Sequence, residues 1–383
     1  MEPSSGSESE YMQPIRRFAL IGHPRSNVHL YKEIERKLLN RERVTRFDDV
    51  EIQTRIEQLA ENTAPFITDF VECYGDGASG IVSGMHIGVP ITHSIIRKVP
   101  KTCIRKIDQA IMLSWKAGAT VAVLGGLTSG LYRKRGDLRS PNLPIAITSG
   151  SALTSAAAVK MIQSAATHLG VTLANSTVAV VGASGEIGGL ISAKLCRHVR
   201  RLHLIAPNRI RLDSTATLLA QTGGGAEVVV FTDLLAGIEQ ANVIAAAAST
   251  STLPIQGKSV KAGTIVCDVG YPRNIGADLC RRQDIFVFRG GLMKLPRPLP
   301  LTVDTGLSNS ELTYGCFAEA IVIALCGAPR KQLCEAAERP LSYMRYIYNL
   351  ALEFGLVEAC PFTTRMSDVQ SSNFASAETA PVD

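Results

Sequence analysis

The sequence predicts an α/β protein with a doubly wound parallel sheet, a smaller α/β domain before it and helices after it. An apolar, β-branched run at 176–181 leads into a glycine-rich turn, and apolar residues then recur at helical spacing over 187–199. From residue 176 onward, short apolar segments alternate with helical ones. Such alternation is typical of parallel strands with helical connections, so this half of the chain is expected to form the doubly wound sheet.

The smaller N-terminal α/β domain is expected over residues 15–170. Its predicted strands are the apolar segments 18–21, 80–82, 87–90, 120–124 and 144–147. Its predicted helices are 29–60, 95–116 with a break at Pro100, and 156–169. The small and polar residues at 148–156 suit either close helix packing or a wall against which a substrate lies.

The parallel sheet is expected over residues 171–305, and a helical segment is expected at 306–361. The predicted strands of the sheet are 176–181, 202–206, 226–231, 241–248, 264–268 and 285–288. Residues 1–14 and 362–383 are rich in Ser, Ala and acidic residues without periodicity, so both are expected to be disordered tails. Ligands of such sheets bind at the carboxyl ends of the strands, which makes the residues after each strand the candidate binding residues.

The composition is that of an ordinary globular protein, since 46% of the 383 residues are apolar and 19% are charged. The chain has no uninterrupted run of about 18 apolar residues, so no membrane span is expected. The acidic N-terminus differs from a signal peptide, and nine scattered cysteines without a Cys-x-x-Cys pair indicate reduced thiols. We therefore expect a cytoplasmic protein that holds no metal.

Positive charge is concentrated in the body of the chain. Residues 1–15 carry a net charge of −3 and residues 362–383 carry −2, so the whole-chain value of +6 leaves +11 on residues 16–361. A basic body favours an anionic partner, such as a phosphorylated cofactor or an acidic carrier protein. Aromatic residues make up only 5% of the chain and are not interleaved with basic ones, which argues against nucleic acid as the main ligand.

One basic stretch lies on the helix predicted at 95–116. It consists of Arg97, Lys98, Lys101, Arg105 and Lys106. The stretch is either a solvated helix face or a docking site for an acidic partner.

The glycine-rich turn at 182–188 has the pattern of a Rossmann-type dinucleotide-binding site. The three glycines of this pattern allow a tight turn, a close approach of backbone N–H groups to a diphosphate, and close packing of helix on strand. Anions are stabilised at the N-terminus of the following helix. The candidate cofactor-binding residues of the turn are therefore Gly182, Ala183, Ser184, Gly185, Glu186 and Ile187. A turn with a purely structural role is the alternative.

The residues after the second strand of the sheet indicate which nicotinamide cofactor is bound. NAD sites carry an acidic residue there, which binds the ribose 2′-hydroxyl. Here the strand is followed by Asn208, Arg209 and Arg211, and arginine binds a phosphate through two parallel hydrogen bonds. We therefore expect NADPH, although the two arginines also suit the solvated start of a helix.

Later strands end at further candidates for the cofactor site. Ala247 follows the fourth strand, and Gly270 and Tyr271 follow the fifth. Tyr271 is a candidate to orient a substrate beside the nicotinamide, and Asn274 is a candidate to bind the carboxamide of the cofactor. The alternative for this segment is a rigid Gly-Pro turn.

Cys316 has the sequence context of a nucleophile. It follows Gly315 and precedes an apolar helix, and a thiol at a helix N-terminus has its pKa lowered by the helix dipole. Thiolates attack thioesters and aldehydes. Glu319 would raise that pKa, so we expect it to cap a helix or bind backbone. A buried structural cysteine is the alternative.

Candidate substrate residues follow two strands of the N-terminal domain. Gly126 lies in the glycine turn after 120–124, and Thr148, Ser149 and Ser151 follow 144–147. The hydroxyl groups of these residues, or backbone N–H groups near Cys316, are candidates to stabilise an oxyanion.

Several of these blocks occur in an order that resembles one known family. They are Ala122–Gly126, Thr148-x-Gly150-x-x-x-Thr154, Thr177–Gly188, Ala241–Ala245, Asp268–Asn274 and Gly315–Glu319. Together they resemble the cyanobacterial-type long-chain acyl-(acyl carrier protein) reductases, which form aldehydes. The resemblance covers roughly residues 120–330 and extends weakly to the segment Phe18–His23.

The resemblance implies an NADPH-dependent reduction of an acyl thioester to an aldehyde through an acyl-cysteine intermediate. Cys316 matches the acyl-accepting cysteine of the family, and Gly182, Gly185 and Gly188 match its NADPH loop. The implied partners are an acyl carrier protein or coenzyme A thioester and a downstream aldehyde-processing enzyme. The sequence departs from the family at 289–310, at Leu153, where a polar residue is expected, and at Pro207, where a basic one is expected.

Two other readings of the sequence stay open. A shikimate-dehydrogenase-like reductase shares the two-domain plan and the Asn208-Arg209 pair, but it reduces a ketone without a cysteine. A catalytically silent NADPH-binding protein is the other. Glutamyl-tRNA reductase also uses a cysteine thioester, but its cysteine lies in the N-terminal domain, where Cys73 and Cys103 have no nucleophile-like setting.

Overall fold

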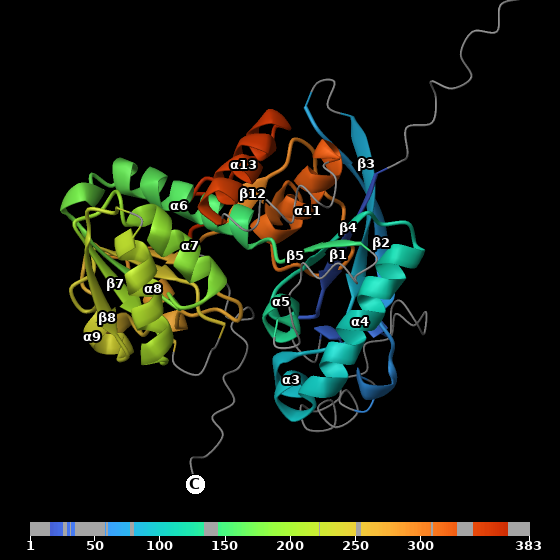
Figure 1. Ribbon diagram of the computed structural model, residues 1–383, viewed down its shortest axis with the longest axis horizontal. Helices are drawn as coiled ribbons and strands as arrows, with labels where there is room; N and C mark the ends of the chain where they lie inside the picture. The colour runs from blue at the N-terminus through green and yellow to red at the C-terminus, as the bar shows by residue number, and fades with distance from the viewer. Residues whose placement is uncertain are drawn as a thin grey trace, which may run out of the picture.

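The computed structural model consists of two α/β units joined by a long helix and by C-terminal helices that lie between them (Figure 1). The structure describes residues 16–25, 29–30, 32–34, 58, 60–76, 80–133, 145–221, 223–249, 254–307, 309–327 and 340–366. The first unit is built on a five-stranded sheet and the second on a six-stranded sheet.

The first sheet has the strand order β2-β3-β1-β4-β5 and is parallel except for β2. Because β1, β3, β4 and β5 run the same way, their carboxyl ends share one edge of the sheet. Ile21 pairs with both Ile87 and Leu124 at that edge, and Val123 pairs with Thr148. The strands are β1 (Arg17–Gly22), β2 (Phe66–Tyr74), β3 (Ile81–Gly88), β4 (Val121–Leu124) and β5 (Ala146–Thr148).

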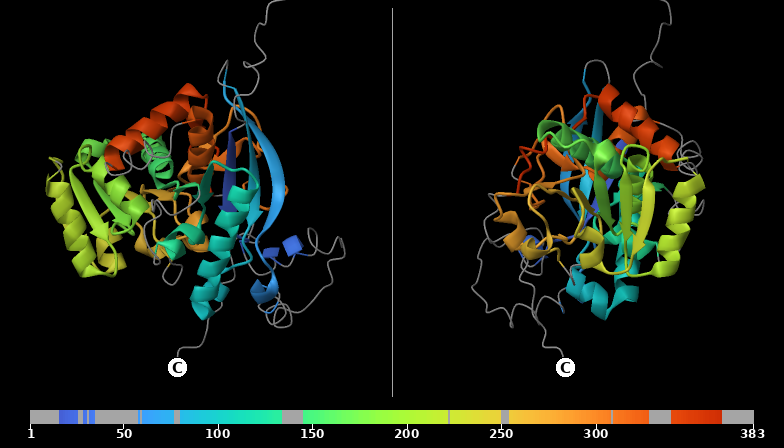
Figure 2. Two further views of the ribbon diagram at one scale, coloured as in Figure 1. Left: turned by 45° about the vertical axis from the view of Figure 1, so that its right-hand side comes forward. Right: turned by 90° about the vertical axis from the view of Figure 1, so that its left-hand side faces the viewer.

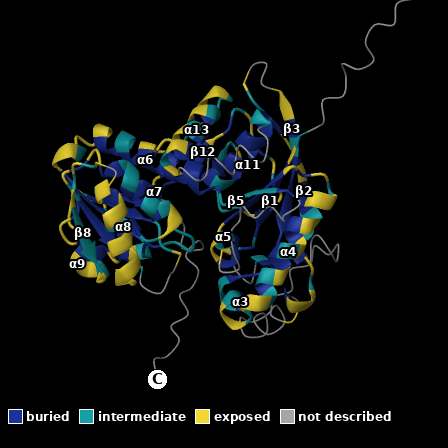
Figure 3. Cartoon of the chain, in the orientation of Figure 1, coloured by how far each residue is buried: buried dark blue, intermediate teal, exposed yellow. Residues whose placement is uncertain are grey.

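Helices cover both faces of this sheet. One face packs against a core that includes α4 (Pro100–Lys116), and α3 (His93–Lys98) and α5 (Leu127–Tyr132) lie beside it. The other face packs against α11 (Gly315–Cys326), whose residues Phe317 to Leu325 are all buried. Figure 3 shows this helix as a buried element between the two units.

The second sheet is fully parallel, with the order β8-β7-β6-β9-β10-β11. Counted along this part of the chain, the order is 3-2-1-4-5-6, that of a Rossmann fold. Its strands are β6 (Thr177–Val181), β7 (Arg201–Ile205), β8 (Glu227–Phe231), β9 (Val243–Ala246), β10 (Ile265–Asp268) and β11 (Phe286–Arg289). Its helices are α7 (Glu186–Leu195), α8 (Arg209–Gln221), α9 (Leu234–Ile238) and α10 (Ala277–Cys280).

The two units share one continuous apolar core. The long helix α6 (Ser151–His168) begins at the edge of the first sheet and runs along the second unit, where it packs against α7. α11 and α13 (Pro340–Glu353) pack on α6 and lie between the two sheets in Figure 1 and in the left view of Figure 2. A small antiparallel sheet of β12 (Leu292–Lys294), β13 (Leu312–Tyr314) and β14 (Val357–Glu358) leads into α11.

Short connecting elements complete the described part of the chain. They are the 3-10 turns η2 (Leu173–Asn175) and η3 (Gly257–Ser259).

The predicted α/β fold with a doubly wound sheet is confirmed, and each strand of that sheet lies within two residues of its predicted bounds. The break at Pro100 is also confirmed, because Pro100 is the first residue of α4.

Three expectations about local structure are wrong. The segments 80–82 and 87–90 form one strand, β3, and its partner β2 was not predicted. α6 begins at Ser151 rather than at 156, because Glu319 from another helix binds the N–H groups of its first turn. Residues 362–366 are not a tail: Thr364 O accepts from Arg289 N–H, and Met366 N–H donates to Val287 O.

Other expectations lie wholly or partly outside the described residues. The tail predicted at 1–14 and the rest of the one predicted after residue 366 lie outside them, as does most of the helix predicted at 29–60. Among the described residues, no helix is long and apolar enough to cross a membrane.

Candidate active site

Cys316 lies at the edge of the first sheet where the carboxyl ends of its parallel strands meet. Cys316 is the second residue of α11, which begins directly after the last residue of β13, Tyr314. The backbone of Cys316 packs on Gly150: a Cβ at Gly150 would lie 2.1 Å from the Cα of Cys316. Gly150 has φ +67°, a left-handed conformation that glycine adopts without strain. This glycine therefore lets the start of α6 contact the start of α11.

Burial raises the pKa of the Cys316 thiol to about 12. The backbone N–H groups of Phe317 and Gly126 lower it, and the nearby Glu319 carboxyl raises it. The sequence-based expectation of a lowered pKa is therefore wrong for the free protein, because desolvation outweighs the helix N-terminus. The same N–H groups remain placed to stabilise negative charge at this sulfur.

Gly126 connects Cys316 with His23 from the end of β1. A Cβ at Gly126 would lie 2.5 Å from Nε2 of His23, and this nitrogen accepts a hydrogen bond from Leu127 N–H at 3.0 Å. Nδ1 of His23 lies 3.0 Å from Pro24 O and donates to it. Burial lowers the pKa of His23 to about 4, so the ring is neutral at pH 7. With both ring nitrogens bonded to backbone, His23 fixes the shape of the glycine turn.

Phe317 closes the site on the side of the first sheet. Its ring packs edge-on against His86 and Tyr314, with centroids 5.9 and 6.2 Å away. A Cβ at Gly125 would lie 2.8 Å from Cε1 of Phe317. The residue after Cys316 is therefore locked between β1, β3 and β4, which fixes the start of α11.

Three predicted substrate residues, Thr148, Ser149 and Ser151, lie in the loop around Gly150. Thr148 Oγ1 accepts from Gly150 N–H at 3.0 Å and donates to Oε1 of Glu319. Ser149 Oγ donates to Oε2 of Glu186 at 3.0 Å, and it lies 3.0 Å from Ser151 Oγ. The loop that packs on Cys316 thus also touches the first turn of the dinucleotide helix α7.

Glu319 caps α6 from α11, as the sequence predicted for its role. Its Oε2 accepts from Leu153 N–H at 2.8 Å, and Tyr343 O–H donates to Oε1 at 3.4 Å. Burial raises the pKa of Glu319, while the bonds from Thr148, Leu153 and Tyr343 lower it. The first turn of α6 is therefore tied to the turn of α11 that follows Cys316.

The turn at 182–188 has the backbone form that a bound diphosphate requires. Gly182 has φ +82°, and a Cβ there would lie 2.8 Å from the carbonyl carbon of Ala247. A Cβ at Gly188 would lie 2.3 Å from Gly182 O, so α7 packs directly on the turn. The first N–H groups of a helix have no partner within it and bind anions. The residues present therefore fit a dinucleotide.

The three residues expected near the ribose of the cofactor have different partners. Asn208 caps α8, because its Oδ1 accepts from Arg211 N–H at 3.0 Å. Arg209 turns to Asp213 on the exposed face of α8, at 2.9 Å. The guanidinium of Arg211 instead donates to Ser184 O at 3.1 Å, in the glycine turn. Arg211 therefore lies at the turn, and Arg209 is engaged away from it.

Tyr271 reaches from the second unit to the first. Its ring lies edge-on to His23 with centroids 5.0 Å apart, and its O–H donates to Arg25 O at 3.5 Å. Burial raises the pKa of Tyr271, so the phenol is protonated at pH 7. Tyr271 thereby lies beside the histidine that contacts Gly126.

The turn that carries Tyr271 is rigid. A Cβ at Gly270 would lie 2.3 Å from Oδ1 of Asn274, and that oxygen accepts from Ala248 N–H at 2.7 Å. The amide nitrogen of Asn274 donates to Ala248 O and Pro272 O. The expectation that Asn274 binds the cofactor carboxamide is not supported, because its side chain holds the turn to the residues after β9.

A cavity of about 380 Å³ lies beside Phe317. Its apolar lining comes mostly from the segment after β12, with α11 and β13 closing it: Leu299, Leu301, Val303, Leu307, Leu312 and Phe317. Tyr314 also lines it. The rest of the lining is polar, and it does not include Cys316: Asp304, Thr305, Asn309, Ser310 and Thr313.

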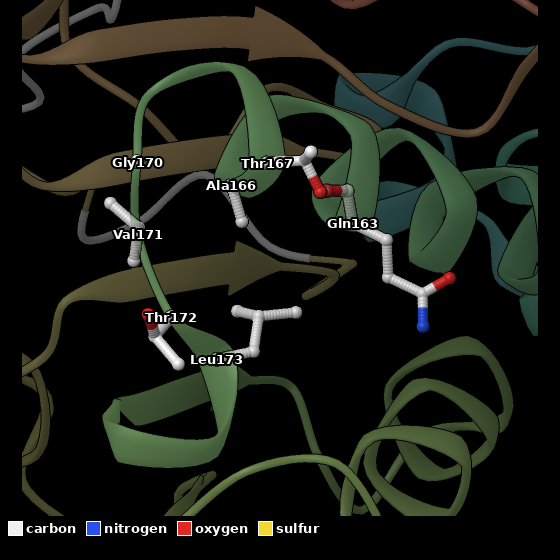
Figure 4. Close-up of a pocket in the computed structure, with 7 residues that line it drawn as sticks. All are labelled: Gln163, Ala166, Thr167, Gly170, Val171, Thr172 and Leu173. Carbon is white, nitrogen blue, oxygen red and sulfur yellow. The ribbon is translucent and has the colours of Figure 1, made fainter.

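A second cavity, of about 530 Å³, lies at the other end of α6 (Figure 4). Its lining residues are Gln163, Ala166, Thr167, Gly170, Val171, Thr172 and Leu173. None of the candidate site residues lies there.

The cysteines and acidic groups of the described residues form no metal site. All eight described cysteines are free thiols, and no three His, Cys, Asp or Glu side chains in this part of the chain lie close enough to hold a metal ion. The basic stretch is shorter than expected, because Lys106 is buried and donates to Thr63 O. Its other four residues are exposed.

Sequence reasoning gave no role to four residues that build this region: His23, Arg133, Phe317 and Gly150. Arg133, at the end of α5, forms an ion pair with Glu186 of α7. Three blocks contained His23, Gly150 and Phe317 without showing their contacts: Phe18–His23, Thr148-x-Gly150 and Gly315–Glu319. Arg133 lies in none of them.

Comparisons with known proteins place the chain among nicotinamide-dependent enzymes. A family model described as Shikimate / quinate 5-dehydrogenase matches residues 163–289. The chain is 29% identical over 242 residues to the long-chain acyl-[acyl-carrier-protein] reductase of Synechococcus elongatus, and the match covers 59% of this chain and 68% of that protein. It is 25% identical over 271 residues to the aminotransferase PigE of a Serratia species, covering 69% of this chain and 31% of that one.

Solved structures similar to this chain include ones that cover 30% of it and ones that cover 72%. The nucleotide-binding domain of glutamyl-tRNA reductase from Thermoplasma volcanium aligns with a TM-score of 0.25 and 17% identity, covering 35% of this chain and 84% of that one. The sequence matches, together with the 3-2-1-4-5-6 sheet and its glycine turn, support a nicotinamide cofactor and the general activity of an NAD(P)-dependent reductase.

Proposed function

We propose that this protein reduces an acyl thioester to an aldehyde with NADPH, through a covalent acyl group on Cys316. The observation that carries the proposal is the position of Cys316. The thiol lies at the start of α11, beside the N–H groups of Gly126 and Phe317, and its backbone packs on Gly150. The loop around Gly150 also contacts Glu186 at the start of the dinucleotide helix.

The first step is an exchange of thioesters. The sulfur of Cys316 bonds to the acyl carbon, the bond from that carbon to the carrier sulfur breaks, and the thiol proton passes to the departing thiolate. Because burial holds the free thiol protonated, loss of its proton is coupled to the arrival of the thioester. The N–H groups of Gly126 and Phe317 stabilise negative charge that develops at this position.

The second step needs a hydride, which a reduced nicotinamide supplies when it is bound. Hydride and a proton convert the acyl-cysteine into an aldehyde and the free thiol of Cys316. The chain contributes position in this step: Tyr271 and His23 lie against each other between the end of β10 and the glycine turn beside Cys316. We assign the diphosphate to the Gly182–Gly188 turn and the 2′-phosphate to the arginine side of that turn.

The cavity beside Phe317, lined by both apolar and polar side chains, is the candidate site for the acyl chain. Four of the lining residues, Leu299, Leu301, Val303 and Leu307, lie within 289–310, where the sequence departs from the acyl-(acyl carrier protein) reductases. Apolar surface removed from water there stabilises a bound chain by about 0.8 kcal/mol for each buried methylene.

An acidic carrier is the proposed source of the thioester. Arg97 and Lys98 end α3, and Lys101 and Arg105 lie in the next two turns, on α4; all four are exposed. α3 follows β3, so these residues begin at the edge of the sheet that holds Cys316. A cluster of cations there attracts the acidic surface of a carrier protein. The relative in Synechococcus elongatus is named for an acyl-carrier-protein substrate.

The match to shikimate and quinate dehydrogenases makes reduction of a ketone the second candidate. That chemistry transfers a hydride to a free carbonyl and does not acylate the enzyme. Detection of an acyl-enzyme therefore separates the two candidates.

The test is intact-mass measurement after incubation with acyl-carrier-protein and acyl-coenzyme A thioesters, without reductant. We expect a mass increase of one acyl group in the wild-type protein, and addition of NADPH should remove it and release aldehyde. Cys316→Ala should abolish both events while NADPH binding stays within about twofold of wild type. Cys360→Ser is the matched control, because Cys360 is an exposed free thiol.

An adduct that persists in Cys316→Ala, or aldehyde production by that variant, would overturn the covalent route through this residue. Oxidation of NADPH by a ketone in the absence of any adduct would favour the second candidate.

A further inference from the structure

An ion pair joins the two units directly at the dinucleotide turn. Arg133, the residue after α5 in the first unit, pairs with Oε2 of Glu186 in the first turn of α7. The two side chains are 42% and 35% exposed, so a ligand in solution can reach both. Ser149 Oγ donates to the same carboxylate oxygen at 3.0 Å.

The carboxylate of this ion pair has the same sign of charge as the expected ligand, a diphosphate. The carboxylate of Glu186 lies in the first turn of the helix that is expected to bind a diphosphate, and it opposes a second negative charge there. Arg133 neutralises that carboxylate from the opposite unit.

A second guanidinium reaches the same turn. Arg211 donates to Ser184 O at 3.1 Å, two residues before Glu186. Burial lowers the pKa of Arg133, and the charge of the nearby Arg211 lowers it further. Two cations and one carboxylate therefore leave one net positive charge over Ser184–Glu186.

We propose that Arg133 is a cofactor-specificity residue, which binds the 2′-phosphate of NADPH together with Arg211. This inference rests on the nicotinamide cofactor of the proposed function and extends it. It adds to the cofactor site a residue from the first unit, although that unit was expected to bind only the substrate.

The position of Arg211 identifies the 2′-phosphate rather than the diphosphate. Arg211 belongs to α8, which follows β7, and the end of this strand is where a Rossmann fold holds the adenosine ribose. Arg209 on the same helix is engaged with Asp213. Arg133 therefore supplies the second guanidinium at the place where the sequence alone suggested Arg209.

A 2′-phosphate bound by arginines of both units would make the preference for NADPH depend on how the two units contact each other. NADPH would bridge Arg133 and Arg211 through its 2′-phosphate, whereas NADH lacks that phosphate. Each charge-assisted hydrogen bond of this kind is typically worth about a tenfold change in affinity.

The test is the dissociation constants of NADPH and NADH, measured by nucleotide fluorescence without a thioester substrate. Arg133→Gln should weaken NADPH binding by about 10- to 100-fold and NADH binding less. Because this change also leaves Glu186 without its partner, the decisive variant is the double change Arg133→Gln with Glu186→Gln. There we expect the preference for NADPH over NADH, given by the ratio of the two dissociation constants, to fall by at least about tenfold.

Arg201→Gln is the matched control, because Arg201 forms an exposed ion pair with Glu227 at the start of β7. It should leave the ratio of the two dissociation constants unchanged. Wild-type affinity of the double variant for NADPH, or equal losses for NADPH and NADH, would overturn the role of Arg133. If the wild-type protein binds neither nucleotide, the cofactor of the proposed function fails as well, so the two failures are distinguishable.

Discussion

At the residue scale, Cys316 shows how two opposite effects act on one sulfur. The start of a helix and the N–H groups of Gly126 and Phe317 favour a thiolate, but burial costs the thiolate its hydration. Burial is the larger effect, so the pKa rises to about 12. A protonated resting thiol is protected from oxidants, which react with the thiolate.

The pH dependence of alkylation checks this balance. The Cys316 pKa lies about three units above the reference value of 9.0, so its thiolate population at pH 7 is about a thousandfold below that of an unperturbed cysteine. We expect its alkylation by iodoacetamide to rise about tenfold per pH unit through pH 10. Peptide mass spectrometry can follow Cys316 and the exposed Cys360 in one sample. A plateau for Cys316 between pH 7 and 8 would contradict the raised pKa.

At the scale of elements, the position of Cys316 depends on how two helices meet. α6 and α11 come into contact at Gly150, and Glu319 of α11 accepts the N–H of Leu153 in α6. The start of one helix thereby sets the start of the other. A shift of about 1 Å at a reacting group costs on the order of a hundredfold in rate.

Two glycines at the ends of α6 offer a matched test of that contact. Gly150 and Gly170 have φ of +67° and +68°, but a Cβ at Gly170 would meet no atom within 4 Å. Gly170→Ala should lower the free energy of unfolding by about 1–2 kcal/mol, the cost of a left-handed alanine. Gly150→Ala should lower it further and slow acyl transfer to Cys316 by about a hundredfold or more.

Denaturant titration and the acyl-adduct assay measure the two effects. Equal behaviour of the two variants in both assays would show that the contact with Cys316 does not control the nucleophile.

At the scale of the whole molecule, charge is the property most directly inferred from the sequence. The helices α3 and α4 carry exposed cations, and the chain has a net charge of +6. Attraction between exposed charges weakens as ionic strength rises, because the screening length falls from about 10 Å at 0.1 M salt to about 3 Å at 1 M.

Salt should therefore distinguish a carrier-bound substrate from a small neutral one. Between about 0.05 and 0.5 M salt, we expect KM for an acyl-carrier-protein thioester to rise about tenfold, because screening removes long-range attraction. KM for a neutral N-acetylcysteamine thioester should change less than twofold. Lys101→Glu should raise only the first of these values at low salt. The same salt response for both substrates would argue against docking through these cations.

The parts that could be predicted from the sequence are those encoded by neighbouring residues. The strand, glycine turn and helix at 176–199 follow from local periodicity, and so do the later strands of that sheet. β2 was missed because Phe70 is apolar but exposed and Asp69 is acidic but buried, so polarity does not alternate along this segment. The burial of Cys316 and the Arg133–Glu186 pair depend on residues far apart in sequence, which no local pattern reveals.

The packing of α11 on the first sheet has a consequence for biosynthesis. Strands β1 to β5 end at Thr148, but the helix that covers their second face begins at Gly315. The second sheet, by contrast, is made from the continuous segment between Thr177 and Arg289. During synthesis, all strands of the second sheet are therefore made before the helix that covers the first sheet, α11. Cys316 arrives with that helix, so the proposed catalytic centre is completed after the sheet of the second unit has emerged.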